Sequence, residues 1–358
     1  MISLQPQQLI TVPESSGSQV SQISNGFLVP AAVCEVAQRI VSAGGHAYLV
    51  GGSVIDLLCN RIPKDWDIEV FGLDYSQIGA LFLDYPCKDV GEAFGILKLV
   101  VDGVEIDLNV PRRDNKVGKG HSDFVVEFDP TMSVREAARR RDFTINTLAM
   151  NLETGEVVDE WGGLADLQAG ILRATDPGLF VEDPLRALRA MQLLPRKART
   201  IDPATMQLIK GMHSEFPHLA KERVYEEWRK LLLTAPQPSI GLELLRESGW
   251  ISWFPEIEAL LTCEQSPAWH PEGTVWTHSC RVADAAAQMR EHIPEQHREA
   301  FVFGALLHDV GKPATTVTPE MVVGVLAAEL VNDPAGRGGR TVVSEFRAAM
   351  DSGRPRMY

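Results

Sequence analysis

The sequence predicts an α+β protein in which a mixed β-sheet with its helices is followed by an all-helical part. Two observations predict this class. Short apolar strands separated by glycine pairs and turns occupy residues 29–175, and apolar residues at helical spacing occupy nearly all of residues 177–261. The chain has 358 residues. At about 100–200 residues per domain, this length corresponds to two or three domains that each bury a core.

The sheet-containing part begins after residues 1–28, which we expect to be a disordered tail because they lack a hydrophobic period. Apolar residues at helical spacing predict a helix from Val29 to Ala43, and the pair Gly44-Gly45 is expected to end this helix. The next elements are expected in this order: a strand over residues 47–50, the pair Gly51-Gly52, a helix from Ser53 to Cys59, and strands at Trp66 to Phe71, Ile96 to Val101 and Val104 to Val110, with a turn at Asp102-Gly103.

The second part reads as helices in two blocks. Helices are expected at Pro184 to Leu194, Pro203 to Met212, Ala220 to Leu233 and Ile240 to Ser248, and a second block is expected from Gly273 to about Lys312. We therefore predict domains at residues 29–175, 176–265 and 266–358. The last of them looks truncated, because the sequence after about Val317 shows no clear helical pattern.

Composition excludes several classes of protein. Apolar residues make up 45% of the chain and charged residues 23%, and the longest apolar run is too short to span a membrane. The five scattered cysteines form no paired motif, and the start of the chain resembles no secretory signal, so we expect a cytoplasmic protein. The net charge of −14 excludes nucleic-acid binding by bulk charge but not by a local basic groove.

The tripeptide Asp65-Trp66-Asp67 is the most informative chemical feature. In a strand, residues two apart project from the same face, so Asp65 and Asp67 lie side by side while Trp66 faces the core. Paired carboxylates repel unless a cation joins them, and Mg²⁺ suits such a pair together with phosphate oxygens. A third acid is expected on a neighbouring strand, and Asp107 or Glu105, which share a face, supplies it. The alternative is a strand end with solvated acids.

Gly51-Gly52 adds a second feature, because it follows a strand and opens a helix. Backbone N–H groups and the Ser53 hydroxyl are expected to be free there to bind a triphosphate. A phosphate cradle followed by paired metal ligands is the assembly that phosphoryl transfer requires.

These motifs resemble a known family. YLVGGSVID over residues 48–56 and KDWDIEV over 64–70 look like the nucleotidyltransferase head of the polymerase-β superfamily. The similarity is greatest to the class II tRNA nucleotidyltransferases (CCA-adding enzymes) and their poly(A) polymerase relatives. Three later motifs also match that family: RRDFTIN over 140–146 with Asp159, Gly162-Gly163 and Asp166-Leu167; EDPLR over 182–186; and KERV over 221–224.

The resemblance implies roles for the matching residues. Asp65 and Asp67 would hold two Mg²⁺ ions, and Asp107 would help to activate the 3′-hydroxyl of an RNA. The nucleotide-binding residues would be Gly51, Gly52, Ser53, Arg112, Arg141, Asp142, Asn146, Asp183, Arg186 and Arg189.

Some of these residues have structural alternatives. Asp142 and Asn146 share a helix face and could instead brace the joint between head and neck. Asp183 and Arg186, three apart on a helix, could read the pairing edge of C or A, or form an ordinary salt bridge. RNA contacts are expected from cations of the neck: Arg186, Arg189, Arg196, Lys197, Arg199, Lys221, Arg223, Arg229 and Lys230.

Three features depart from the family pattern. Ile55 and Cys59-Asn60 stand where an arginine and Leu-Gly are usual, so activity could be weakened. Ile55→Arg is expected to raise activity if that position contacts phosphate. Residues 106–124 look like a longer basic loop, in which His121 has no assigned role. The C-terminal block resembles an HD phosphohydrolase domain through His278 and His308-Asp309, and Asp333 and Asp351 lack matching context for a fourth ligand.

We therefore expect a template-independent enzyme that adds CCA to the 3′ end of tRNA from CTP and ATP and releases pyrophosphate. Its expected fold is a polymerase-β-like head with a mixed sheet, an all-helical neck and an HD-like helical domain. Addition of A alone, poly(A) synthesis, an RNA-binding remnant and a phosphohydrolase remain as alternatives. The sequence predicts no membrane partner and does not indicate the oligomeric state.

Overall fold

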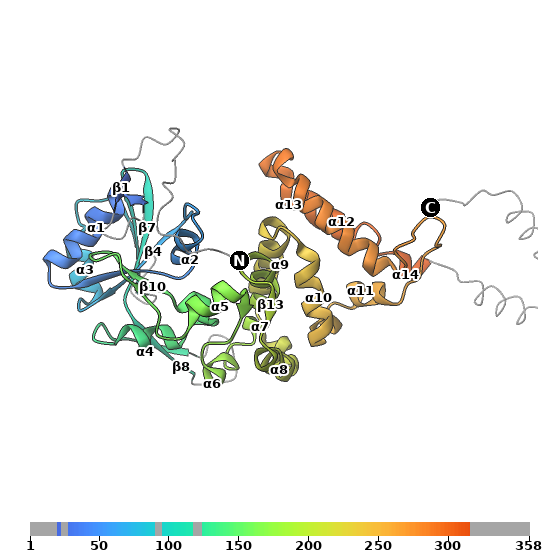
Figure 1. Cartoon of the computed structure of the whole chain (residues 1–358), viewed down its shortest axis with the longest axis horizontal. Helices are drawn as coiled ribbons and strands as arrows, with labels where there is room; N and C mark the ends of the chain where they lie inside the picture. Colours follow the sequence, from blue (N-terminus) through green and yellow to red (C-terminus); the bar gives the residue numbers. More distant parts are fainter. Residues whose placement is uncertain (1–19, 23–27, 90–94, 117–123, 316–358) are drawn as a thin grey trace, which may run out of the picture. The chain divides into compact units, whose positions relative to one another are not determined.

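The computed structural model describes residues 20–22, 28–89, 95–116 and 124–315 (Figure 1). The described chain divides into two compact units. The first runs to Phe254 and also contains Cys280–Leu306, and the second consists of Pro255–Ser279 and residues from 307 onward. No helix in the described ranges combines the length and the apolar character that crossing a membrane would need.

The first unit is built on a seven-stranded mixed sheet, with strand order β11-β10-β3-β4-β7-β6-β5. β4 and β7 are parallel, and the other pairs are antiparallel. The mixed sheet is thus confirmed. The strands are β3 (His46–Val50), β4 (Trp66–Phe71), β5 (Cys87–Asp89), β6 (Ile96–Val101), β7 (Val104–Asn109), β10 (Ala149–Asn151) and β11 (Val157–Val158). Positive φ angles at Asp102 and Gly103 make the tight turn between β6 and β7.

Three short helices lie beside this sheet: α1 (Ala31–Ser42), α2 (Gly52–Leu58) and α3 (Tyr75–Leu81) (Figure 1). The stripe predicted for α1 is confirmed, because Val33, Val36 and Ile40 are fully buried. On the central strand β4, the apolar side chains are buried like those of α1. The sheet therefore presents its polar side chains at defined positions on a rigid core.

Two expectations about irregular segments were wrong. Residues 20–22, placed in a disordered tail, form β1 (Val20–Gln22), which pairs with β2 (Leu28–Pro30). Part of the expected loop at 106–124 forms β8 (Arg112–Lys116), which pairs with β9 (Phe124–Phe128). Backbone hydrogen bonds between short strands need no hydrophobic period, so the pattern did not reveal them. His121 lies outside the described residues.

The sheet is followed by small elements that lead into the helical part. They are α4 (Val134–Arg139), η2 (Thr144–Thr147), α5 (Gly163–Ala169), β12 (Ile171–Leu172), α6 (Pro177–Phe180) and β13 (Thr200–Ile201). The larger helices confirm the predicted ones: α7 (Leu185–Lys197), α8 (Pro203–Gly211), α9 (Lys221–Thr234), α10 (Pro238–Ser248), α12 (Val275–Met289) and α13 (Glu295–Leu307). Short 3₁₀ helices follow three of them: η3 (His213–His218), η4 (Trp250–Trp253) and η6 (Arg290–His292). The second unit also contains α11 (Pro255–Glu258), η5 (Ala259–Leu261) and α14 (Lys312–Thr315).

Helices α7, α9 and α10 pack on one another and form the core of the helical part. α10 approaches α7 closely at Gly241. A Cβ atom at this position would lie 2.3 Å from the carbonyl oxygen of Met191 and 2.7 Å from Cδ1 of Leu231. Because a backbone oxygen cannot move aside cheaply, only glycine fits this contact.

Gly241→Ala should therefore lower the free energy of unfolding by about 1–3 kcal/mol, the usual cost of overpacking. Gly79→Ala is a matched control on α3, where a new Cβ meets nothing within 4 Å. It should raise stability by about 0.5–1 kcal/mol, because alanine is a better helix former. Urea unfolding of the purified full chain measures both changes. Equal stability of the Gly241→Ala variant and the wild type would contradict the packing described for α7 and α10.

Candidate functional site

Two carboxylates stand opposite each other on the parallel strands β4 and β7. The register pairs Asp67 with Asp107 and Trp66 with Ile106. Glu105 lies before this paired stretch, is exposed, and faces Val100 of β6 instead. The choice that the sequence left open between Glu105 and Asp107 is thus resolved in favour of Asp107 as the neighbour of Asp67.

Asp65 completes an acidic group with these two residues. It precedes β4 and is exposed, whereas Asp67 is half-buried and Trp66 is buried, as the alternation predicts. Burial, with repulsion from Asp107 and Asp65, raises the pKa of Asp67 to about 6, although Arg141 and Lys98 oppose the shift. Lys98 donates a hydrogen bond to Asp107. A divalent cation at this place would relieve the repulsion between the carboxylates.

The turn at Gly51 lies beside this acidic group. β3 pairs with β4 up to Leu49 opposite Ile68, so the residues that follow β3 run past the start of β4. Gly51 has φ +70°, a left-handed conformation that glycine adopts without strain, and its Cβ position lies 3.4 Å from Arg141 Nη1. Gly52 then begins α2. Ser53 is not free as expected, because it is buried and its hydroxyl donates to the carbonyl oxygen of Val50 (3.0 Å).

Glu69 is a site residue that the sequence reasoning missed. It is 3% exposed, and its carboxylate pairs with Arg141 (3.0 Å) and Arg140 (3.4 Å). Arg141 also donates to the carbonyl oxygen of Asn146 (3.0 Å). Strand alternation places Glu69 on the face of Asp67 and could have revealed it. The pairing holds the Arg141 guanidinium between Glu69 and the Gly51 turn.

Asp142 braces the sheet-containing part against α7, which was one of its two predicted roles. Its side chain is 6% exposed and accepts hydrogen bonds from Arg189 Nε (2.7 Å) and Asn146 Nδ2 (2.8 Å). Burial alone would raise the pKa of Asp142, but Arg189 and the bond from Asn146 outweigh it, and the net pKa is lowered. A nucleotide contact by these three residues stays a prediction.

The motif around α5 also serves structure. Asp159 accepts hydrogen bonds from the backbone N–H groups of Gly163 (2.7 Å) and Leu164 (2.9 Å) at the start of the helix. Asp166 accepts from Thr144 (2.7 Å) and pairs with Arg173 (3.0 Å). Both acids therefore fix α5 next to η2, close to the brace formed by Asp142.

The residues predicted to read a base lie at the start of α7. Asp183 Oδ1 accepts from the N–H of Leu185 (3.1 Å), and Arg223 lies 3.6 Å from Asp183 Oδ2. Arg186 donates to the carbonyl oxygens of Leu179 (3.0 Å) and Arg140 (2.6 Å). These contacts fix both side chains. Arg112 begins β8 and is half-buried, and its phosphate contact stays a prediction.

Other predicted RNA-binding cations on α9 have acidic partners. Arg229 pairs with Glu299 (2.8 Å) and with Glu226 (3.7 Å), and Lys230 pairs with Glu227 (3.1 Å). A cation that forms an ion pair within the protein attracts a ligand anion less strongly than an unpaired cation does. Lys221, at the start of the same helix, is exposed.

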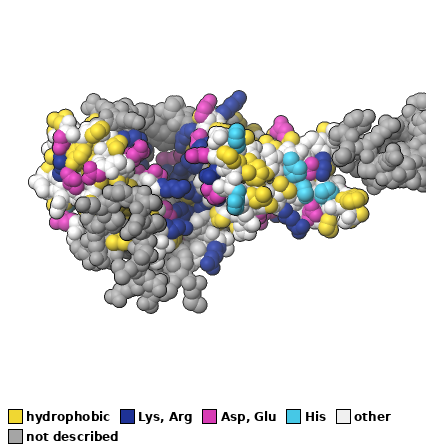
Figure 2. Space-filling view, turned by 90° about the horizontal axis from the view of Figure 1, so that it is seen from above, with side chains coloured by type: hydrophobic (Ala, Val, Ile, Leu, Met, Phe, Trp, Pro, Cys, Tyr) yellow, Lys and Arg dark blue, Asp and Glu magenta, His cyan; other side chains and the backbone are white. Residues whose placement is uncertain are grey.

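A basic pocket of about 170 Å³ lies where α2 meets the end of α7. Its cations are Arg61, Arg196, Lys197 and Arg199. Asp56 pairs with Lys197 (2.6 Å) and Arg61 (2.9 Å), while burial lowers the pKa of Lys197 and of Arg196. An anion bound here would therefore stabilise the charged forms. Figure 2 shows Lys and Arg side chains gathered in a hollow of the first unit.

Ile55 lines the same pocket and is fully buried. The expectation that Ile55→Arg raises activity if this position contacts phosphate stays a prediction, and the burial of Ile55 counts against it. An arginine at this position would place another buried cation among Arg196 and Lys197 and would destabilise the fold.

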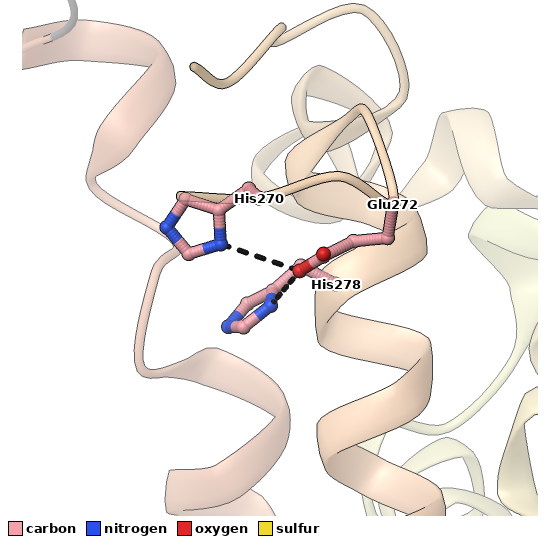
Figure 3. A group of neighbouring side chains, drawn as sticks. All are labelled: His270, Glu272 and His278. Carbon is pink, nitrogen blue, oxygen red and sulfur yellow. Dashed lines mark hydrogen bonds and ion pairs between the residues drawn. The ribbon is translucent and has the colours of Figure 1, made fainter. Parts of the chain in front are cut away.

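The second unit brings together possible metal ligands. Donor atoms of His278, His308 and Asp309 lie close enough to hold one ion, and so do those of His270, Glu272 and His278 (Figure 3). His270 and Glu272 were not predicted from the sequence. Asp333 and Asp351 lie outside the described residues.

Three family models match the chain. Residues 47–173 match the poly A polymerase head domain, residues 200–261 match the probable RNA- and SrmB-binding site of polymerase A, and residues 275–345 match the HD domain.

Curated relatives and solved structures agree with these models. The multifunctional CCA protein of Xanthomonas campestris is 39% identical over 75% of this chain and 64% of its own length, and that of Vibrio parahaemolyticus is 36% identical over 77% and 65%. The chain thus spans less than two thirds of these relatives. The fold resembles that of the Bacillus stearothermophilus CCA-adding enzyme in complex with CTP (24% identity, TM-score 0.54, 85% and 82% of the two chains). It also resembles the Thermotoga maritima CCA-adding enzyme complexed with tRNA (21%, 0.55, 85% and 72%).

Because the pKa of Asp67 is raised, Asp67→Asn should increase the free energy of unfolding by an amount that depends on pH when divalent ions are absent. The folded-state pKa of about 6 exceeds the ordinary value of 3.8, so the stability linked to the protonated carboxyl is present below pH 3.8 and is lost as pH rises through 6. Asparagine does not ionise. The variant should therefore gain about 1–3 kcal/mol more in unfolding free energy at pH 8 than at pH 4.

Urea unfolding in EDTA at the two pH values measures this difference. Glu105→Gln is the control, because the exposed Glu105 side chain should change stability by less than about 0.5 kcal/mol at either pH. A gain for Asp67→Asn that is the same at pH 4 and pH 8 would contradict the repulsion described for this site.

Proposed function

We propose that this chain belongs to the family of tRNA nucleotidyltransferases and poly(A) polymerases and that it adds C and A to the 3′ end of tRNA. The nucleotides come from CTP and ATP, pyrophosphate leaves, and no nucleic-acid template is used. The observation that carries the proposal is the register that places Asp67 against Asp107, with Asp65 and the Gly51 turn beside them. We assign transfer to residues 29–175, base and tRNA recognition to 176–265, and an HD-like domain to 266–358.

The acidic group fits divalent cations by its chemistry. Oxygen ligands suit Mg²⁺, and the repulsion that raises the pKa of Asp67 is the kind that a bound cation relieves. We propose that Asp65 and Asp67 hold Mg²⁺. When bound, Mg²⁺ neutralises phosphate charge and favours ionisation of an attacking hydroxyl.

The other residues of the head bind and orient the reactants. Asp107, on the strand next to Asp67, accepts the proton of the RNA 3′-hydroxyl or holds that hydroxyl in line. The backbone at Gly51 and Gly52 lies along the triphosphate, and the guanidinium of Arg141 stands next to it. Because Glu69 fixes Arg141 before substrate binds, little ordering entropy is lost on binding.

Base selection is proposed for Asp183 and Arg186. C and A both carry an exocyclic amino group that an acid can accept from, and both have a ring nitrogen that a guanidinium can meet. The contacts of Asp183 with Leu185 and of Arg186 with backbone carbonyls support this role, because a template formed by side chains must be rigid. Asp142, Asn146 and Arg189 then act as the brace that positions α7 relative to the acids.

Replacement of Asp107 tests the proposal most simply. Asp107→Asn should lower nucleotide incorporation by about a hundredfold or more, because a charge that stabilises the reacting groups is removed. Asp67→Ala should have at least the same effect and leave tRNA affinity nearly unchanged. Glu105→Gln is the matched control on the same face of β7 and should retain wild-type activity.

The assay uses purified full chain, Mg²⁺ and labelled CTP or ATP, with tRNAs that lack all three terminal nucleotides, lack only the final A, or are complete. Incorporation of both nucleotides supports CCA addition, and label from ATP alone indicates an A-adding enzyme. No incorporation by the wild-type chain while it still binds tRNA would overturn the proposed activity.

The basic pocket leads to a second prediction. If Arg61 and Arg199 contact tRNA phosphates, the double variant Arg61→Gln/Arg199→Gln should lower the slope of log Kd against log salt by about 1–2. Arg246→Gln is the control, because Arg246 is an arginine of α10 paired with Glu243 (2.5 Å). Filter binding over a series of salt concentrations measures both slopes. An unchanged slope for the double variant would exclude this pocket from the RNA interface.

A further inference from the structure

His278 in the second unit belongs to two overlapping groups of possible ligands. It lies on α12, and its Nδ1 atom faces Glu272, from the loop before that helix, with His270 nearby (Figure 3). Its Nε2 atom faces His308 and Asp309. The imidazole of His278 thus belongs to both groups. Its two nitrogen atoms can bind an ion only on one side, and the other nitrogen must then form a hydrogen bond.

The separations between donor atoms distinguish these roles. Nδ1 of His278 lies 2.6 Å from Oε1 of Glu272, which is a hydrogen-bond distance and too short for two atoms bound to one ion. On the other side, Nε2 of His278 lies 3.3 Å from Nε2 of His308 and 3.8 Å from Oδ2 of Asp309. Ligands about 2.0–2.2 Å from a tetrahedral ion lie roughly 3.3–3.6 Å apart, and these separations are close to that range.

The hydrogen bond to Glu272 decides which nitrogen carries the proton. A neutral imidazole has one N–H and one lone pair. Because the Glu272 carboxylate accepts from Nδ1, the lone pair of His278 is on Nε2, where His308 and Asp309 lie. His270 Nδ1 approaches the same carboxylate oxygen at 3.2 Å and helps to hold it.

Asp309 shows that the ligand side fits a cation. Its Oδ2 atom is buried and lies 3.2 Å from Nε2 of His308. Nζ of Lys312 lies 2.7 Å from it, and also donates to Gln265 (2.7 Å). A lysine so placed balances the charge of Asp309 when no ion is bound. Two imidazole nitrogens and one carboxylate oxygen form a set that suits a divalent transition metal.

We propose that Glu272 is a positioning residue for a metal site on His278, His308 and Asp309. The HD-like motif accounts for the three ligands, whereas Glu272 lies outside it and sets the tautomer and ring orientation of the first ligand. Partners of this kind typically change metal affinity by about 10- to 100-fold. The proposal does not depend on the transferase activity, which involves other residues in the first unit.

Binding of Co²⁺ to the full chain tests this assignment. The chain carries Asp67→Ala, so that the acids of the head are weakened as competing ligands, and is freed of metal with a chelator. Visible absorption of Co²⁺ should then report one ion with nitrogen ligands per chain. His308→Ala and Asp309→Asn should lose this signal. Glu272→Ala should raise the Kd by 10- to 100-fold, and His270→Ala should change it by less than threefold.

Two further results keep the test decisive. Glu272→Gln retains an acceptor oxygen but removes the charge, so it serves as a second variant if Glu272→Ala fails to fold. A rise in the Kd for Co²⁺ of at least threefold in Glu272→Gln supports the proposal. Wild-type affinity in a folded Glu272 variant would overturn it. Loss of Co²⁺ binding in His270→Ala but not in His308→Ala would also overturn it, because the ion would then lie on the other side of the ring. Circular dichroism of each variant checks folding.

Discussion

The parallel pairing of β4 with β7 is the constraint on which the site depends. It places Asp67 directly against Asp107, and burial together with the neighbouring acids raises the pKa of Asp67 to about 6. Without a cation, this arrangement is strained by like-charge repulsion. One strand position farther along the same face, Glu69 is neutralised by two arginines. The sheet thus carries one acid, Glu69, that is compensated within the protein, and one acidic pair, Asp67 and Asp107, that we propose to bind ions and beside which the Gly51 turn lies.

The helical part serves this site through buried polar contacts more than through exposed charge. Asp142 and Arg189 join the sheet-containing part to α7, and Asp183 and Arg186 lie just before and within the first turn of the same helix. Rigid coupling of this kind keeps the side chains that we propose to read the base at a fixed position relative to the acids, as the proposed selection between nucleotides requires. At the other end of α7, the cations of the basic pocket face an open volume. One helix therefore links the proposed sites for base and RNA.

Much of the fold and part of the site could be predicted from the sequence, because strand alternation and helical spacing are local. β4 and β6 were predicted with their observed bounds. Alternation could not choose between Asp107 and Glu105, since register depends on pairing with another strand. Alternation also could not show that the Ser53 hydroxyl donates a hydrogen bond to the carbonyl oxygen of Val50. Glu272 was missed because its partner, His278, is six residues away across a loop.

The central claim is that carboxylates at β4 and β7 are poised for divalent cations. It is tested most directly by a carboxyl ¹³C NMR titration of Asp67 in the full chain, without and with Mg²⁺. The account predicts a pKa of about 6 for Asp67 in the metal-free protein and a fall below the ordinary value of 3.8 when Mg²⁺ is added. A metal-free pKa near 3.8 that does not move with Mg²⁺ would contradict it.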